Sequence, residues 1–151
     1  MCESRLRLHG IVSLIFVLIS FIIGVNAIAY DSVILSAVNA FSILAFFYVV
    51  PVTYCAKCRT REQCNHYIFG KISVMLSKFR DEPYRPADWL PVVLIMLAII
   101  VLPQYWLAKH VYLLVSYWVL FAVAGIEVLT FICPNCLNQK CALCRNRAMS
   151  M

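Results

Sequence analysis

The chain has 151 residues, of which 64% are hydrophobic and 13% are charged, and its mean hydropathy is +0.86. A soluble domain needs more charge to cover its surface, so this composition excludes an ordinary water-soluble fold. The net charge of +6 does not indicate nucleic-acid binding, because the sequence has no nucleic-acid motif and most of the basic excess flanks apolar segments. We therefore expect the lipid bilayer, and no nucleic acid, to be the surroundings of this protein.

Four apolar segments follow one another along the chain, and each has about the 20 residues that a helix needs to cross ~30 Å of hydrocarbon. The first three carry no charge, and the fourth is interrupted only by Glu127. Backbone groups in lipid must satisfy their own hydrogen bonds, so the segments are expected to be helices. The sequence predicts an all-α integral membrane protein, a single membrane domain over residues 1–151, with spans at residues 11–30, 33–54, 89–107 and 111–132.

The first segment has an alternative interpretation as a cleaved signal peptide. Arg5 and Arg7 precede it, and small residues near Ala27 could form a cleavage site. Its uncharged stretch is longer than the usual signal-peptide core, and the next span begins almost at once. We expect an uncleaved first span; cleavage would leave three spans without moving the cysteines across the membrane.

Two short turns, Asp31-Ser32 and Lys109-His110, pair the spans into two helical hairpins. These turns must lie on one side of the membrane, and both termini with the 55–88 loop on the other. Of the 13 Lys and Arg residues, 12 fall on that second side and only Lys109 falls on the first. The positive-inside rule then predicts that both termini and the loop are cytoplasmic. We expect this membrane to be the cell membrane.

Seven of the eight cysteines form two clusters, each of which begins where a span ends. A Cys-x2-Cys turn directs two thiolates to one point, and four such ligands close a tetrahedral shell around Zn²⁺. On a cytoplasmic face, where thiols stay reduced, clustered cysteines more often bind metal than form disulfides. One histidine completes the first set, so the 55–88 loop and the 133–151 tail supply two full sets of four ligands: Cys55, Cys58, Cys64 and His66, then Cys133, Cys136, Cys141 and Cys144.

The sequence leaves the pairing of these ligands and the identity of the metal open. Each cluster can hold its own metal, or the turns Cys55/Cys58 and Cys133/Cys136 can share one while the remaining ligands form the second site. Two zinc ions suit the ligands and the spacing; an iron–sulfur cluster and a metal-free thiol relay are the alternatives. Cys2 stands apart as an unassigned thiol or a lipidation candidate.

Residues 67–80 have helical periodicity, with an apolar stripe that includes Phe69, Met75 and Leu76 and with basic residues largely away from it. This pattern predicts an amphipathic helix in the cytoplasmic interface, with a partner-protein groove as the other use of the same face. Asp88 is expected to cap the third span.

Glu127 is the only ionisable residue well inside a span, and it is a possible intramembrane proton site. The structural alternative is a hydrogen bond to Asn26, Asn39, Ser13 or a neighbouring subunit. His9 and His110 lie near opposite membrane faces, and we expect both to be interfacial side chains.

No Ser-His-Asp set, paired carboxylates or phosphate loop accompanies the cysteines, so we expect no catalysis by this chain alone. The sequence predicts a membrane-anchored scaffold or subunit whose metal-bound cytoplasmic cap docks a protein partner. The alternative is an iron–sulfur subunit that couples a cytoplasmic electron donor to a quinone or haem in the membrane.

Overall fold

A computed structural model describes residues 2–58, 61–63 and 67–134. The fold is 83% helical, and its described residues contain no strand. Four helices in this part of the chain are long and apolar enough to cross a membrane, namely residues 7–29, 33–57, 86–107 and 111–132. The predicted all-α membrane fold is confirmed.

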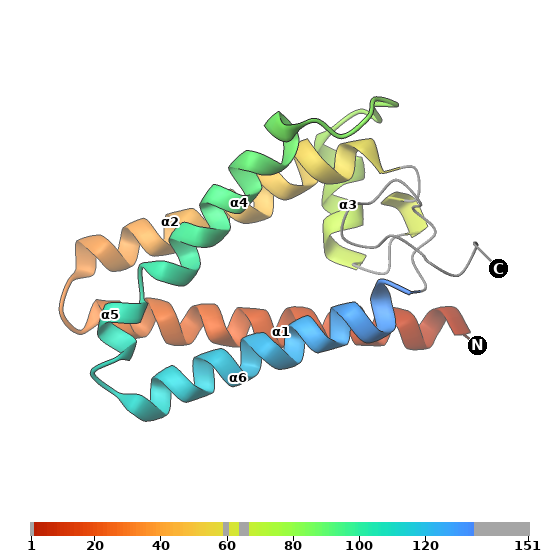
Figure 1. Cartoon of the computed structure of the whole chain (residues 1–151). Helices are drawn as coiled ribbons and strands as arrows, with labels where there is room; N and C mark the ends of the chain where they lie inside the picture. The colour runs from red at the N-terminus through yellow and green to blue at the C-terminus, as the bar shows by residue number, and fades with distance from the viewer. Residues whose placement is uncertain (1, 59–60, 64–66, 135–151) are drawn as a thin grey trace.

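The helices form two layers that diverge toward the cysteine-bearing end (Figure 1). One layer pairs α1 (Cys2–Ala29) with α6 (Val111–Glu127), and the other pairs α2 (Val33–Val49) with α4 (Pro86–Val101). The short α5 (Gln104–Leu107) lies at the opposite end, where the layers meet. Helices joined by the short turns are therefore not always the closest partners, since the first helix packs mainly on the last.

Small and polar residues form the contacts between helices. Ser13 in α1 donates a hydrogen bond to the Ala124 carbonyl of α6 (3.2 Å), and Ser36 in α2 donates to the Val25 carbonyl of α1 (3.0 Å). Lipid is as apolar as leucine, so membrane helices associate through close packing and hydrogen bonds rather than through the hydrophobic effect. These serines are buried for that reason.

The third span is not one uninterrupted helix, because α4 ends at Val101 and α5 begins at Gln104. Pro103 lies in the break; it has no N–H to continue the helical ladder, and its ring would crowd the preceding turn. The Leu107 amide hydrogen bonds back to the Pro103 carbonyl (3.0 Å), so the chain resumes helical structure directly after the break. This bend lets α5 pack against α1 beside the buried Tyr117.

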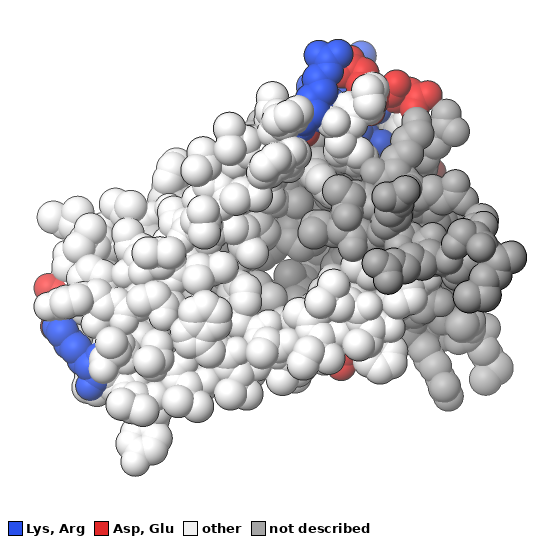
Figure 2. Space-filling view, viewed as in Figure 1, with Lys and Arg blue, Asp and Glu red and all other residues white. Residues whose placement is uncertain are grey.

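The two short turns are linked at this end by an ion pair in which Lys109 Nζ donates to Asp31 Oδ2. Lys109 lowers the pKa of Asp31, and Asp31 raises the pKa of Lys109, mainly through this hydrogen bond. On the face shown in Figure 2, most charged side chains gather at the two ends of the molecule, and the broad belt between them is uncharged apart from acidic atoms at its lower edge. Such a belt is what a bilayer-spanning protein presents to lipid.

The predicted amphipathic helix forms as α3 (Tyr67–Leu76), four residues shorter than the pattern suggested, and lies near the open end of the layers (Figure 1). Phe69 stacks on Phe47 of α2, with ring centroids 5.4 Å apart. The expected stripe is nevertheless divided: Met75 is 84% exposed, whereas Ser73 is fully buried. The small Ser73 side chain allows a close approach to the bundle, so polarity alone does not decide which side chains of α3 are covered.

Candidate functional site

The second and fourth spans end in the same way, and each ends at a cysteine. A π-helical turn, η1 (Val50–Tyr54), precedes Cys55, and a second, η4 (Val128–Ile132), precedes Cys133. In both, the cysteine amide bonds to the valine carbonyl five residues back. Wide turns of this kind are rare and often occur at functional sites, since they rotate the residues that follow.

Threonine hydroxyls accompany both wide turns. Thr53 donates to the Val49 carbonyl (2.8 Å), and Thr130 donates to the Ile126 carbonyl (2.6 Å). A hydroxyl that occupies the carbonyl four residues back competes with the helical ladder at that point. In the first turn Pro51 also removes an amide donor. The local sequence therefore favours a widened turn at both helix ends.

The Cys55–Cys58 segment folds as a tight turn of 3-10 helix (η2, Cys55–Lys57) that is held by backbone hydrogen bonds. The Cys58 amide donates to the Cys55 carbonyl (3.0 Å), and the Arg80 amide donates to the Ala56 carbonyl (3.0 Å). Ala56 is fully buried, whereas both cysteines are partly exposed. The turn thus rests on the 77–85 connector with its two thiols at the edge.

Lys57, within the same turn, forms ion pairs with two acidic residues that follow it in the chain. Its side chain is only 3% exposed, and its ammonium group lies 2.7 Å from Asp88 Oδ2 and 3.6 Å from Glu82 Oε2. Asp88 also accepts the Arg85 amide (2.7 Å). Asp88 therefore caps α4 as expected, although from inside its first turn, because the helix already begins at Pro86. One carboxylate joins the cysteine turn to the start of the third span.

Cys133 is buried, 8% exposed, and it packs against Tyr54 and Val128. Because Tyr54 directly precedes Cys55, this side-chain contact reaches from the end of the second span to the end of the fourth. Cys133 takes part in a disulfide, whereas Cys55 and Cys58 are thiols. Only a reduced sulfur can serve as a thiolate ligand, so a metal site that includes Cys133 requires its reduction first.

The structure brings Cys55, Cys58 and Cys133 to one end of the bundle, but it does not bring three ligands to one point. Within residues 2–58, 61–63 and 67–134, no three Cys, His, Asp or Glu side chains form a group that could hold a metal. The other five predicted ligands lie outside the described residues: Cys64, His66, Cys136, Cys141 and Cys144. The predicted ligand sets stay predictions.

Glu127 has a partner that the sequence pattern did not indicate. His9 Nδ1 lies 2.7 Å from Glu127 Oε2, and the two side chains are 31% and 21% exposed. The imidazole stacks flat on Phe131, with centroids 4.2 Å apart. Glu127 bonds His9 rather than Asn26, Asn39 or Ser13, which were the structural alternatives within the chain; Ser13 instead donates to the Ala124 carbonyl, and Asn26 to the Ile22 carbonyl. The pair joins α1 to the end of α6.

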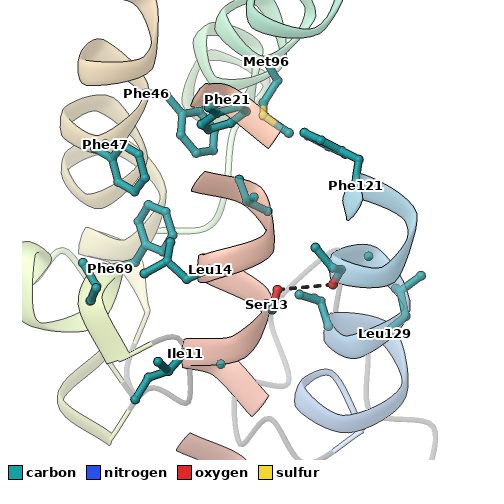
Figure 3. A pocket seen from close by; sticks show the side chains of 16 residues that line it. Ile11, Ser13, Leu14, Phe21, Phe46, Phe47, Phe69, Met96, Phe121 and Leu129 are labelled. Atoms are coloured by element: carbon teal, nitrogen blue, oxygen red, sulfur yellow. Dashed lines mark hydrogen bonds between the residues drawn. The ribbon is translucent and has the colours of Figure 1, made fainter. Parts of the chain in front are cut away.

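A cavity of about 340 Å³ lies where the two layers diverge (Figure 3). Residues of α1, α2, α3, α4 and α6 line it together with the start of η4, and nearly all are apolar. Phe21, Phe46, Phe47, Phe69 and Phe121 surround it with aromatic rings. The one hydroxyl in the lining, Ser13, is already bonded to Ala124 (dashed in Figure 3).

The sequence analysis did not predict the roles of His9 and Lys57, although the sequence contains a signal for each. His9 is the last ionisable residue before the first uncharged stretch, and it lies at a depth comparable to that of Glu127 if the first and last helices are neighbours. Lys57 stands between two cysteines, and three acidic residues follow in the connector and the first turn of α4. In both cases the pairing of helices had to be known first. No protein-family model, curated protein or solved structure matches the chain.

Proposed function

We propose that this protein is a membrane-anchored scaffold or subunit whose cytoplasmic Cys/His cap binds structural zinc and docks a protein partner. The cytoplasmic orientation rests on the distribution of the basic residues, 12 of 13 of which fall on one side. The zinc assignment rests on the number, type and spacing of the eight ligands. The partner is inferred because so little of the chain extends beyond the spans.

The observation that carries this proposal is the contact between Tyr54 and Cys133. The two cysteine clusters begin at helix ends that the Tyr54 side chain connects, so ligands from both can reach a shared site. A metal bound there would join the α1/α6 layer to the α2/α4 layer at the end where the layers diverge. The clamped Cys55–Cys58 turn supports this role, because a structural site needs ligands held in fixed positions.

Zinc in this cap would require Cys133 in its reduced form. A cytoplasmic location provides reducing conditions, whereas an oxidising compartment would preserve the disulfide. The proposal therefore ties metal binding to membrane orientation. The proposed scaffold requires a metal-bound cap and a cap that faces the cytoplasm.

The experiment compares the protease sensitivity of reduced wild type with that of Cys133→Ser. Loss of one ligand from a closed shell should release the cap, so protease should cut between residues 60 and 85, where the wild type resists it. The four spans should stay inserted, since helix packing holds them. Cys2→Ser is the control, because Cys2 belongs to neither cluster. Equal cleavage of all three proteins would contradict the proposal.

The second candidate is an iron–sulfur electron-transfer subunit, and the His9–Glu127 pair favours it. A coupled proton could be taken up by a carboxylate that lies six residues before a cluster ligand. The two candidates differ in colour: an iron–sulfur protein purified without oxygen absorbs visible light, and a zinc protein does not. A colourless preparation with stoichiometric zinc would exclude the second candidate.

A further inference from the structure

The cavity between the layers has the shape of a slot that is closed at one end. Along α1 its lining runs from Gly10 to Phe21, which is about 16 Å at 1.5 Å per residue. Phe21, at the inner end, is buried, whereas Ile11 and Leu129, at the cysteine-bearing end, are exposed. The slot therefore opens near the ends of the spans and closes toward the middle of the bundle.

The lining suits a hydrocarbon chain and lacks what a polar group needs. A polar head placed inside would lose its hydrogen bonds to water without replacement, because the Ser13 hydroxyl is already committed to Ala124. An apolar chain would instead gain dispersion contacts with the surrounding aromatic rings. A volume of about 340 Å³ is within the range of small-molecule sites in proteins.

We propose that this slot binds one acyl chain of a phospholipid, inserted from the cysteine-bearing end. The open end lies at the level where the spans end, which is where lipid headgroups lie. The headgroup would stay in that layer, and the chain would extend inward alongside α1 and α6. An isoprenoid quinone fits less well, since its polar ring would find no available hydrogen-bond donor in the slot. This proposal does not depend on the metal cap.

Gly125 allows the slot to be filled by a single substitution. It lines the cavity, and a Cβ atom added to it meets no other atom within 4 Å. Gly125→Leu should therefore occupy the slot without a clash and should favour the helix, because glycine is a poor helix former. The matched control is Ala122→Leu, which adds bulk on an exposed face of the same helix that does not line the cavity.

The test is photo-crosslinking in phosphatidylcholine nanodiscs that contain a phosphatidylcholine with a diazirine in one acyl chain. A diazirine near the chain end should label Phe21, which is buried at the inner end of the slot, whereas one near the headgroup should label residues near Ile11 and Leu129 instead. Gly125→Leu should reduce these adducts at least about tenfold, because displacing even two buried methylenes has that effect. Ala122→Leu should leave them unchanged.

Adducts confined to lipid-facing residues of the wild type, or slot adducts of equal yield in Gly125→Leu, would overturn the proposal. Labelling of the buried Phe21 in the wild type needs no variant, so the test stands even if Gly125→Leu does not fold. Menaquinone that displaces the slot adducts at a concentration where added phosphatidylcholine does not would also overturn it, since the occupant would then be a quinone.

Discussion

Replacing Lys57 with methionine should loosen the Cys55–Cys58 turn. Methionine keeps much of the apolar stem of lysine but removes the charge that faces Asp88 at 2.7 Å. Removing one partner of a buried ion pair costs about 3–5 kcal/mol, because the other charge is left buried without compensation. Asp88 is 15% exposed and keeps the hydrogen bond from the Arg85 amide, so we expect the lower end, about 3 kcal/mol. Glu82 is 57% exposed and adds little.

Hydrogen exchange at the Arg80 amide provides the assay, because this amide donates to the Ala56 carbonyl inside the turn. A loss of about 3 kcal/mol should speed its exchange about 100-fold, if the turn opens locally before exchange. Lys78→Met is the control, since Lys78 is an exposed lysine on the same side of the molecule.

A double substitution separates the missing charge from simple loss of packing. Lys57→Met combined with Asp88→Asn removes the uncompensated charge, while the amide oxygen can still accept from the Arg85 N–H. Most of the protection at Arg80 should return, because an apolar or neutral replacement of both partners is often nearly neutral. The ion pair would have no role in holding the turn if the Arg80 amide exchanged at the wild-type rate in Lys57→Met. The same would follow if it exchanged as fast in Lys78→Met as in Lys57→Met.

Two further perturbations test the ends of the bundle. The lowered pKa of Asp31 means that its pair with Lys109 stabilises the fold above the ordinary aspartate pKa of 3.8, and this stabilisation is lost as pH falls through the lowered value. The raised pKa of Lys109 means that stabilisation persists below 10.5 and is lost as pH rises through the raised value. Asp31→Asn should therefore lower the melting temperature by the same amount at every pH between these two pKa values. If the difference in melting temperature between wild type and Asp31→Asn varied across about pH 5–9, the ion pair would not be its cause. At the other end, Glu127→Leu should cost about 1–3 kcal/mol in unfolding experiments, since it leaves the partly buried His9 imidazole without this hydrogen-bond partner, whereas Glu127→Gln should cost less because its amide can still bond. Equal losses would show that the bond does not stabilise the helix pair.

The spans could be predicted from the sequence, but the pairing of the helices could not. Length and absence of charge define a span, since lipid imposes both. Which face of a span packs is not visible in hydropathy, because every face is apolar. The better signal is the position of small polar residues: Ser13 and Ser36 both make bonds between helices. Reading the serines as packing positions would have placed α1 beside both α2 and α6.

The ligand sets of the candidate site stay predictions, and the contacts that support the described part of the site were not predicted. Spacing alone predicted the Cys55–Cys58 turn, because the geometry of such a turn is local. The Lys57–Asp88 and His9–Glu127 contacts join residues 31 and 118 positions apart, and no local pattern predicts such contacts. The apolar stripe of α3 is covered at some residues and exposed at others, again because its contacts involve residues far apart in the sequence. Its stripe was assigned as if one uniform surface covered the helix, whereas Phe69 meets α2 and Met75 remains outside.

The metal content of the reduced protein tests the central claim most directly. The protein is purified without oxygen under a thiol reductant, and zinc and iron are measured per chain together with the visible spectrum. The scaffold proposal predicts a colourless protein with two zinc ions per chain, and a lower zinc content in both Cys55→Ser and Cys133→Ser. A brown protein that contains iron would contradict the zinc assignment, and a protein with neither metal would contradict the metal cap itself.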